Sequence, residues 1–225
     1  MTVHWNKRKP VYGWGINDLP YTVKPWEVGE NGKRVDPCPY YDRWIQVLKR
    51  TLSAKVKEKC TCYTDAEICD RWQKASEFKA WMETQVWEEP GRKEKLQLDK
   101  DILIPGNKVY SPETCAFVPR ELNCVLIIID NELGVPGVVK RTNNYGTDRY
   151  VATISTRNVK SDLGSHKTLE AAHAAWQLAK IERLEFELNE YRNLVCYRSD
   201  VDAAILKRIS KLRQDYEEGR ITYSL

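Results

Sequence analysis

The sequence predicts an α+β protein, with helices toward both ends of the chain and short strands and turns in its middle. Apolar residues recur at helical spacing between residues 39 and 56 and again after residue 168. Between them lie strand-length apolar runs, separated by strong turn signals such as Pro105-Gly106-Asn107 and by the Asn- and Gly-containing loop 142–148.

We expect four segments within the 225 residues. They are an irregular aromatic and basic arm (1–38), a helical front with a strand–strand–helix core (39–130), a sheet packed on one helix (131–181) and a helical tail (182–225). Seven of the eight tryptophans precede residue 90, which marks the front as a distinct region. The arm either follows a phosphate backbone through Lys7, Arg8 and Lys9 or is held to the core by its aromatic residues.

The front is predicted to contain two helical regions. Tyr41, Trp44, Ile45 and Leu48 lie on one face of a helix over residues 39–56. A second helical region covers residues 65–69 and 72–87, with Ser76 as its N-cap, and it ends at Pro90-Gly91.

Residues 96–123 are predicted to form a strand, a turn, a second strand and a helix. Polar and apolar residues alternate over Leu96–Ile104, and the turn at residues 105–107 leads into a short strand at Val109-Tyr110. Ser111 then caps a helix over Pro112–Pro119, because proline is favoured at the first helical position.

The following segment is predicted to be a three-stranded antiparallel sheet on one helix. Its strands are Gly137–Arg141, Arg149–Thr156 and Lys160–Ser165, and a helix begins with a capping signal at Thr168. Basic and polar residues on the strands would allow a sheet face to enter a DNA groove, so double-stranded DNA is the expected partner.

The tail is predicted to be a helical hairpin. One helix runs from Thr168 to about Asn193, and a second runs from Asp200 to Glu218. Apolar residues on both helices would either pair them within one chain or form a homodimer.

Composition excludes few functions. The net charge of +4 is a mild basic bias. No apolar run is long enough to span a bilayer, and the basic N-terminus lacks the apolar core of a signal peptide, so we expect a cytoplasmic protein that does not contact a membrane.

Seven cysteines without a signal peptide indicate reduced thiols, and the spacing of Cys60, Cys62 and Cys69 favours core thiols over a zinc site.

A set of residues occurs in a characteristic order along the predicted sheet and helix: Gly137, Val138, Tyr150, Ala152, Ile154, Leu163, Gly164, Thr168, Glu170, Ala171, Ala172, Ala175 and Ala179. In this order they resemble the DNA-binding domain of the plant Apetala-two and ethylene-response-factor proteins and its phage relatives. That family reads DNA with its exposed sheet face. The resemblance implies the following contacts: Arg141, Thr153, Ser155 and Lys160, with Arg149 and Arg157 nearby. Val139, Ser155, Asp162 and His166 depart from the plant pattern, so the fold carries over but the base preference does not.

The Gln97–Asn123 segment resembles the ββα-metal nuclease core, often called H-N-H. There an Asp-His pair supplies a metal ligand and the general base, and a helix residue completes the site. The pair aligns with Asp99-Lys100, and Thr114 falls near the helix ligand. The resemblance implies Asp99, Lys100 and Asp101 as catalytic residues, and Lys100 and Lys108 as phosphate contacts.

Lys100 stands where the histidine is expected, and three interpretations follow. The core is a retired nuclease scaffold that binds DNA, or it shares only the topology of the family. Alternatively it is an active nuclease in which Asp99, Asp101 and Glu113, with Thr114, hold Mg²⁺ or Mn²⁺. A protonated lysine would repel the metal ion, which favours the first interpretation.

The strings L-D-K-D-I-L, P-G-N-K and Y-S-P-E-T-C, followed by the sheet segment, also resemble a group of bacteriophage proteins described as homing-type endonucleases. We therefore expect a DNA-binding protein of the host cytoplasm with a degenerate nuclease core. The alternatives are an active metal-dependent endonuclease or nickase, and a non-catalytic regulator or phage counter-defence protein that binds a host protein.

Overall fold

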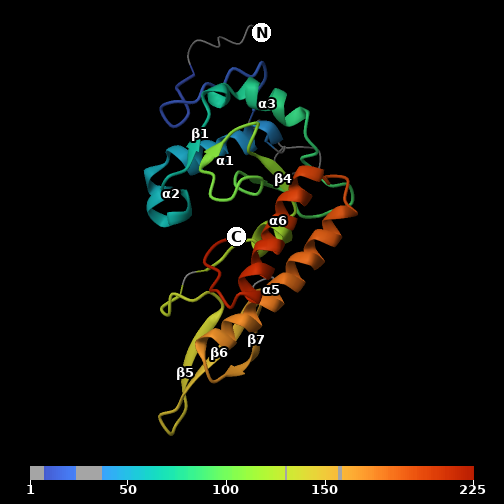
Figure 1. Ribbon diagram of the computed structural model, residues 1–225. Helices are drawn as coiled ribbons and strands as arrows, with labels where there is room; N and C mark the ends of the chain where they lie inside the picture. The colour runs from blue at the N-terminus through green and yellow to red at the C-terminus, as the bar shows by residue number, and fades with distance from the viewer. Residues whose placement is uncertain (1–7, 24–36, 130, 157–158) are drawn as a thin grey trace, which may run out of the picture. The chain divides into compact units, whose positions relative to one another are not determined.

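A computed structural model describes residues 8–23, 37–129, 131–156 and 159–225 (Figure 1). Lys7, Arg157 and part of the predicted arm lie outside these residues. The described chain contains six α-helices and a three-stranded antiparallel sheet, which confirms the predicted α+β class. It divides into two compact units: unit 1 is Met1–Trp87 with Leu98–Phe117, and unit 2 is Glu88–Gln97 with Val118–Leu225. The division therefore falls inside the Gln97–Asn123 segment.

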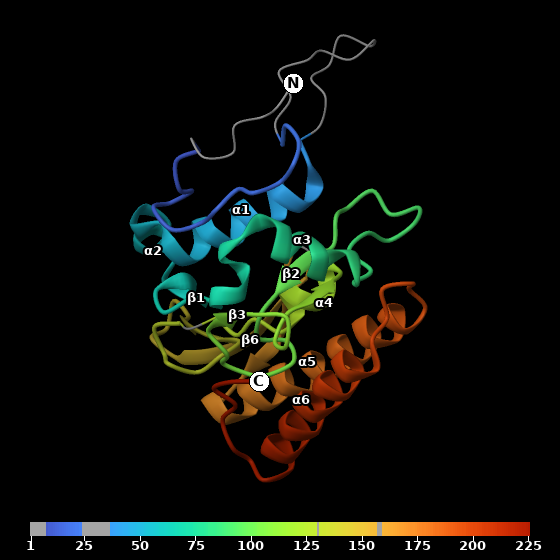
Figure 2. The same ribbon diagram turned by 90° about the horizontal axis from the view of Figure 1, so that it is seen from above.

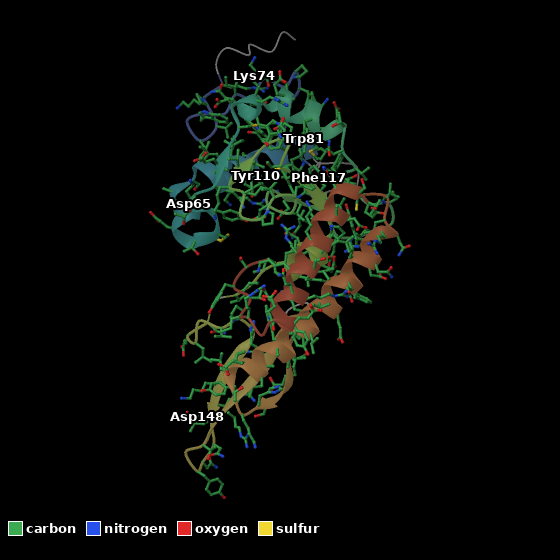
Figure 3. All side chains as sticks on the ribbon, viewed as in Figure 1. Asp65, Lys74, Trp81, Tyr110, Phe117 and Asp148 are labelled. Atoms are coloured by element: carbon green, nitrogen blue, oxygen red, sulfur yellow. A yellow bond between two sulfur atoms is a disulfide. The ribbon has the colours of Figure 1, made fainter. Side chains whose placement is uncertain are left out.

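Unit 1 contains helices α1 (Pro39–Leu52), α2 (Ala54–Lys59) and α3 (Ala75–Glu83), with short 3-10 turns η2 (Thr61–Tyr63) and η3 (Asp70–Gln73). The helix predicted over residues 39–56 is interrupted at Ser53, whose backbone is extended. Trp44, Trp72 and Phe78 are completely buried in the core of this unit. Trp81 stacks on Phe117 with ring centroids 5.7 Å apart, and both side chains are labelled in Figure 3.

The N-terminus of α3 is capped from a distant part of the chain. Lys74 occupies the N-cap position and makes no capping hydrogen bond with its side chain. Instead the Asp18 carboxylate accepts hydrogen bonds from the Ser76 backbone N–H at 2.9 Å and from the Ser76 hydroxyl at 2.5 Å. The prediction that Ser76 is the N-cap is therefore wrong, because the N-cap is Lys74, two residues earlier, and the Ser76 N–H of the first turn bonds to Asp18.

Four short strands form two separate pairs. β1 (Glu67–Ile68) pairs in parallel with β3 (Val109–Tyr110), and β2 (Gln97–Asp99) pairs with β4 (Ala116–Val118). The predicted strand over residues 96–104 is thus shortened to three residues. It ends where the Asp99 carboxylate accepts the backbone N–H groups of Asp101 and Ile102, at 2.9 and 2.6 Å, and turns the chain.

The helix predicted over Pro112–Pro119 is not formed. Residues 112–114 make a single turn, in which the Cys115 N–H returns to the Ser111 carbonyl, and β4 follows at once. Ala116, Phe117 and Val118 are all buried, as expected for a short core strand rather than a surface helix. The helix begins after Pro119 instead, as α4 (Arg120–Val125).

Unit 2 agrees with the predicted elements. β5 (Val138–Thr142), β6 (Asp148–Thr156) and β7 (Val159–His166) form one antiparallel sheet with β6 in the centre. Helix α5 (Leu169–Arg192) contacts all three strands, and its N-cap Thr168 accepts a hydrogen bond from the Ala171 N–H. Helix α6 (Ser199–Glu217) lies beside α5 (Figure 2). Within the described residues, no helix is long and apolar enough to cross a membrane.

A buried histidine, His173 of α5, binds the C-terminal segment of the chain. The Thr222 backbone N–H donates to His173 Nε2 at 3.0 Å, and His173 Nδ1 lies 2.9 Å from the Pro136 carbonyl oxygen. These partners require a neutral ring that carries its proton on Nδ1. His173 therefore joins the segment before β5, helix α5 and the C-terminal residues.

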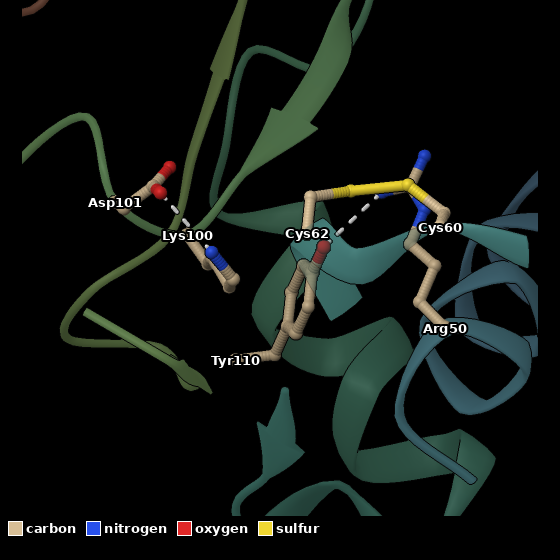
Figure 4. Close-up of a disulfide and its surroundings, with 6 residues drawn as sticks. All are labelled: Arg50, Cys60, Cys62, Lys100, Asp101 and Tyr110. Carbon is tan, nitrogen blue, oxygen red and sulfur yellow. Dashed lines mark hydrogen bonds and ion pairs between the residues drawn. A yellow bond between two sulfur atoms is a disulfide. The ribbon is translucent and has the colours of Figure 1, made fainter. Parts of the chain in front are cut away.

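Cys60 and Cys62 form a disulfide at the end of α2, which corrects the expectation that all thiols are reduced (Figure 4). The tight turn between α2 and η2 brings their Cα atoms to 5.4 Å, within the usual range for this bond. Five described cysteines are free, including Cys69.

Candidate nucleic-acid interface

The strand register of unit 2 gathers the predicted DNA contacts on one side of the sheet. The cross-strand pairs on this side are Arg141 with Arg149, Thr153 with Asp162, and Ser155 with Lys160. Residues directly opposite each other in a sheet point to the same face. We call this side the outer face.

The other side of the sheet is covered by α5. Val138 and Ala152 are cross-strand partners on that side, and both are buried. A Cβ atom added to Gly137 would lie 2.0 Å from Trp176 of α5, so strand and helix are in close contact here. The helix therefore covers the Val138 side of the sheet, and the basic side chains lie on the opposite side.

The outer face carries an excess of positive charge. The Arg141 side chain is 57% exposed and pairs with Asp162 at 3.1 Å. Arg149 and Lys160 make no ion pair with any residue that the structure describes. Like charges directly opposite each other, as in Arg141 and Arg149, repel, and a bound anion would relieve that repulsion.

Thr153 and Asp162 differ from the expectation. Thr153 lies on the outer face as predicted, but it is buried and its N–H donates to the Gly137 carbonyl at 2.7 Å, so little of its side chain is accessible for a contact. Asp162 is not among the predicted contacts, yet its carboxylate accepts a hydrogen bond from the Arg141 guanidinium. Ser155 is exposed as expected, and Arg157 is outside the described residues.

A bulge in β7 sets the position of Asp162 opposite Thr153. The register shifts between Val151 and Thr153, and Gly164 has a φ of +115°, a conformation that favours glycine. A bulge adds a residue to one strand and re-aims its side chains. The Leu163-Gly164 pair was the sequence signal for it.

The acidic residues of the proposed nuclease core are held by their own loop. Burial raises the pKa of Asp99 to about 6, and the neighbouring Asp101 charge adds to this rise. The two carboxylates are brought together, but the Lys100 ammonium lies 3.1 Å from Asp101. Lys100 is buried, which leaves little room for the expected phosphate contact, whereas Lys108 is exposed.

The other two predicted metal ligands have different partners. Glu113 is exposed and pairs with Arg71 at 3.2 Å, and the Thr114 hydroxyl donates to the Val109 carbonyl at 2.8 Å. In the described part of the chain, no group of three His, Cys, Asp or Glu side chains is arranged to hold a metal ion. Of the four predicted metal ligands, the structure therefore brings Asp99 and Asp101 together, whereas the side chains of Glu113 and Thr114 bind other groups.

Two further residues shape this segment. Asn107 donates to the carbonyl groups of Lys100 and Val109, at 2.6 and 2.7 Å, and thereby closes the loop between β2 and β3. Arg50 donates to the Tyr110 hydroxyl at 3.4 Å, as Figure 4 shows. Both interactions stabilise unit 1 and leave the Lys108 side chain exposed.

Asn123, which was expected just beyond a helix, lies inside α4. Its side-chain amide donates to Gln97 Oε1 at 2.9 Å. The proline before Arg120 was the sequence signal for this helix.

In comparisons with protein-family models, with curated proteins and with solved structures, none matched this chain, so the site is interpreted from its own residues.

Proposed function

We propose that the protein binds double-stranded DNA through the outer face of β5, β6 and β7. The observation that carries the proposal is the alignment of Arg141, Arg149 and Lys160 on one sheet face, where Asp162 is the carboxylate that offsets them. This arrangement leaves a local positive charge on a rigid surface.

DNA is the polyanion that suits such a surface. Each phosphate carries a negative charge at regular spacing, and the major groove is wide enough to admit a β-ribbon. The exposed Ser155 hydroxyl can donate to or accept from a base edge. The basic side chains would position the sheet, and polar groups between them would contribute sequence preference.

The Gln97–Asn123 segment has a supporting role in this proposal. It is a degenerate nuclease scaffold of the kind found in the phage group that the sequence resembles, with Lys108 as a phosphate contact. The proposed setting is the cytoplasm of a phage-infected host.

The first test is the salt dependence of binding to a fluorescently labelled DNA duplex, measured by anisotropy. We expect Arg149→Ala to weaken binding and to reduce the log–log salt slope by roughly one unit, because one phosphate contact is lost. Arg141→Ala should weaken binding less, since Asp162 already offsets its charge.

Lys140→Ala is the matched control. Lys140 neighbours Arg141 on β5, but it lies on the other face and pairs with Asp148 at 2.7 Å. Equal losses in Lys140→Ala and Arg149→Ala would show that only net charge matters, and would reject the outer face as the interface.

An active endonuclease is the alternative, and supercoiled plasmid tests it. Incubation with Mg²⁺, Mn²⁺ or EDTA would produce metal-dependent nicking if Asp99 and Asp101 hold a metal ion. Loss of that nicking in Asp99→Ala would establish the nuclease. A mobility shift without nicking would support the proposed binding function.

A further inference from the structure

Unit 2 contains a cavity of about 890 Å³ whose wall includes Ser155 and Lys160 of the proposed DNA-binding face, but whose other residues that function does not use. Its wall is formed by α4, the segment after it, residues of all three strands of the sheet and α5. The apolar part of the wall includes Val125, Ile127, Val138 and Trp176. Its size lies within the range typical of small-molecule sites.

Lys180 is the unusual group in this wall. The residue is only 6% exposed, and burial lowers the pKa of its ammonium to about 8. Its Nζ donates to the Ile127 carbonyl at 3.0 Å and lies 5.7 Å from the Trp176 ring centroid. An ammonium has three N–H donors, so hydrogen-bonding capacity remains. No carboxylate of the described residues pairs with it.

The remaining charges of the wall also favour an anion. Arg120 and Lys160 are exposed and have no ion-pair partner in the described chain. Of the two acidic wall residues, Glu121 is neutralised by an ion pair with Arg92. The other acidic residue, Glu94, forms no ion pair with a described residue.

We infer that this cavity binds a small organic anion in which a carboxylate, sulfonate or phosphate is joined to an aromatic or aliphatic body. The anionic group would lie against Lys180, and the apolar body would lie along Trp176, Ile127 and Val138. Such a ligand supplies the charge that the buried ammonium lacks and removes the apolar wall from water. This inference does not depend on DNA binding.

Fluorescence titration of the whole protein with anilinonaphthalene sulfonate tests the inference. This probe is an aromatic sulfonate whose emission rises in apolar surroundings. We expect one saturable site, and we expect Lys180→Gln to weaken the affinity about tenfold, because a hydrogen bond to a charged group is lost. The neutral analogue phenylnaphthylamine should bind the wild type and Lys180→Gln equally.

Two more variants make the result decisive. Lys207→Gln removes an exposed lysine of α6 and should bind the sulfonate like the wild type. Cys124→Trp places a bulky side chain at an exposed position of the cavity wall and should reduce binding even if Lys180→Gln does not fold. Wild-type affinity in both Lys180→Gln and Cys124→Trp, or an equal loss in Lys207→Gln, would overturn the inference.

Discussion

At the residue scale, Gly137 shows how strictly one position is determined. Its φ is +75°, and a Cβ atom would lie 2.0 Å from Trp176 Cδ1. Backbone conformation and packing therefore both exclude a side chain at the start of β5.

We expect Gly137→Ala to lower the free energy of unfolding by more than 2 kcal/mol, about 1–2 for the backbone conformation and more for the clash with Trp176. Urea unfolding followed by circular dichroism measures this loss. Gly146→Ala is the control, because Gly146 has a φ of +76° and a Cβ atom added there would meet no described residue within 4 Å apart from its chain neighbours. Equal losses in the two variants would mean that the contact with Trp176 has no role.

The residues of the outer face could be predicted in part. Alternation along β6 places Arg149 and Ser155 on one face, and the sequence is sufficient for that conclusion. The pairing of Asp162 with Arg141 could not be predicted, because a glycine within a strand indicates a bulge but not the register that follows it. The burial of Thr153 depends on its contact with Gly137, which lies 16 residues away in the sequence.

At the scale of secondary structure, α3 depends on a cap that is distant in sequence. Asp18 and Ser76 are 58 residues apart, and the carboxylate meets the positive end of the helix. This contact also holds the segment around Asp18 against the helix.

We expect Asp18→Ala to lower the free energy of unfolding of unit 1 by about 1 kcal/mol, the usual cost of losing an N-cap. Thermal unfolding followed by tryptophan fluorescence is a suitable measurement, since Trp81 lies in α3 and its ring contacts Trp72. Asp65→Ala removes an exposed carboxylate of the same unit as a control. A loss no larger than that of the control would show that the cap does not stabilise α3.

Elements were predictable where the signal is local. The strands of unit 2 and helices α5 and α6 follow from periodicity, turn residues and the Thr168 cap. A helix is predicted over residues 112–119 because Ser111 and Pro112 are typical of a helix start. The structure has a strand there instead, because Ala116–Val118 are all buried in the core. The two-residue strand β1 exists only through its pairing with β3, which no local pattern reveals.

At the scale of the whole molecule, Glu89 joins the two chain segments of unit 2. Its carboxylate accepts the backbone N–H groups of Val195 and Cys196, each at 2.9 Å. Burial raises the pKa of Glu89, but these donors and Arg92 together outweigh it, so the pKa lies below its ordinary value of 4.5. The resulting stabilisation is present above pH 4.5 and is lost as the pH falls through the lower folded-state pKa.

We expect Glu89→Gln to lower the free energy of unfolding of unit 2 by roughly 1–2 kcal/mol at neutral pH. The difference from the wild type should shrink as the pH is lowered below 4.5 and through the lowered folded-state pKa of the wild-type carboxylate. Glu88→Gln, at an exposed neighbouring position, is the control for chemical denaturation at both pH values. A difference that does not change with pH would contradict the role given to the charge.

The separation of Glu89 from its partners also has a consequence for biosynthesis. Val195 and Cys196 follow Glu89 by 106 and 107 residues. At a ribosomal rate of about 5–20 residues per second, the segment that contains Glu89 waits roughly 5–20 s before its partners are translated. Once Phe117 has been translated, the nascent chain contains all of unit 1, whereas Glu89 still lacks the backbone donors of Val195 and Cys196.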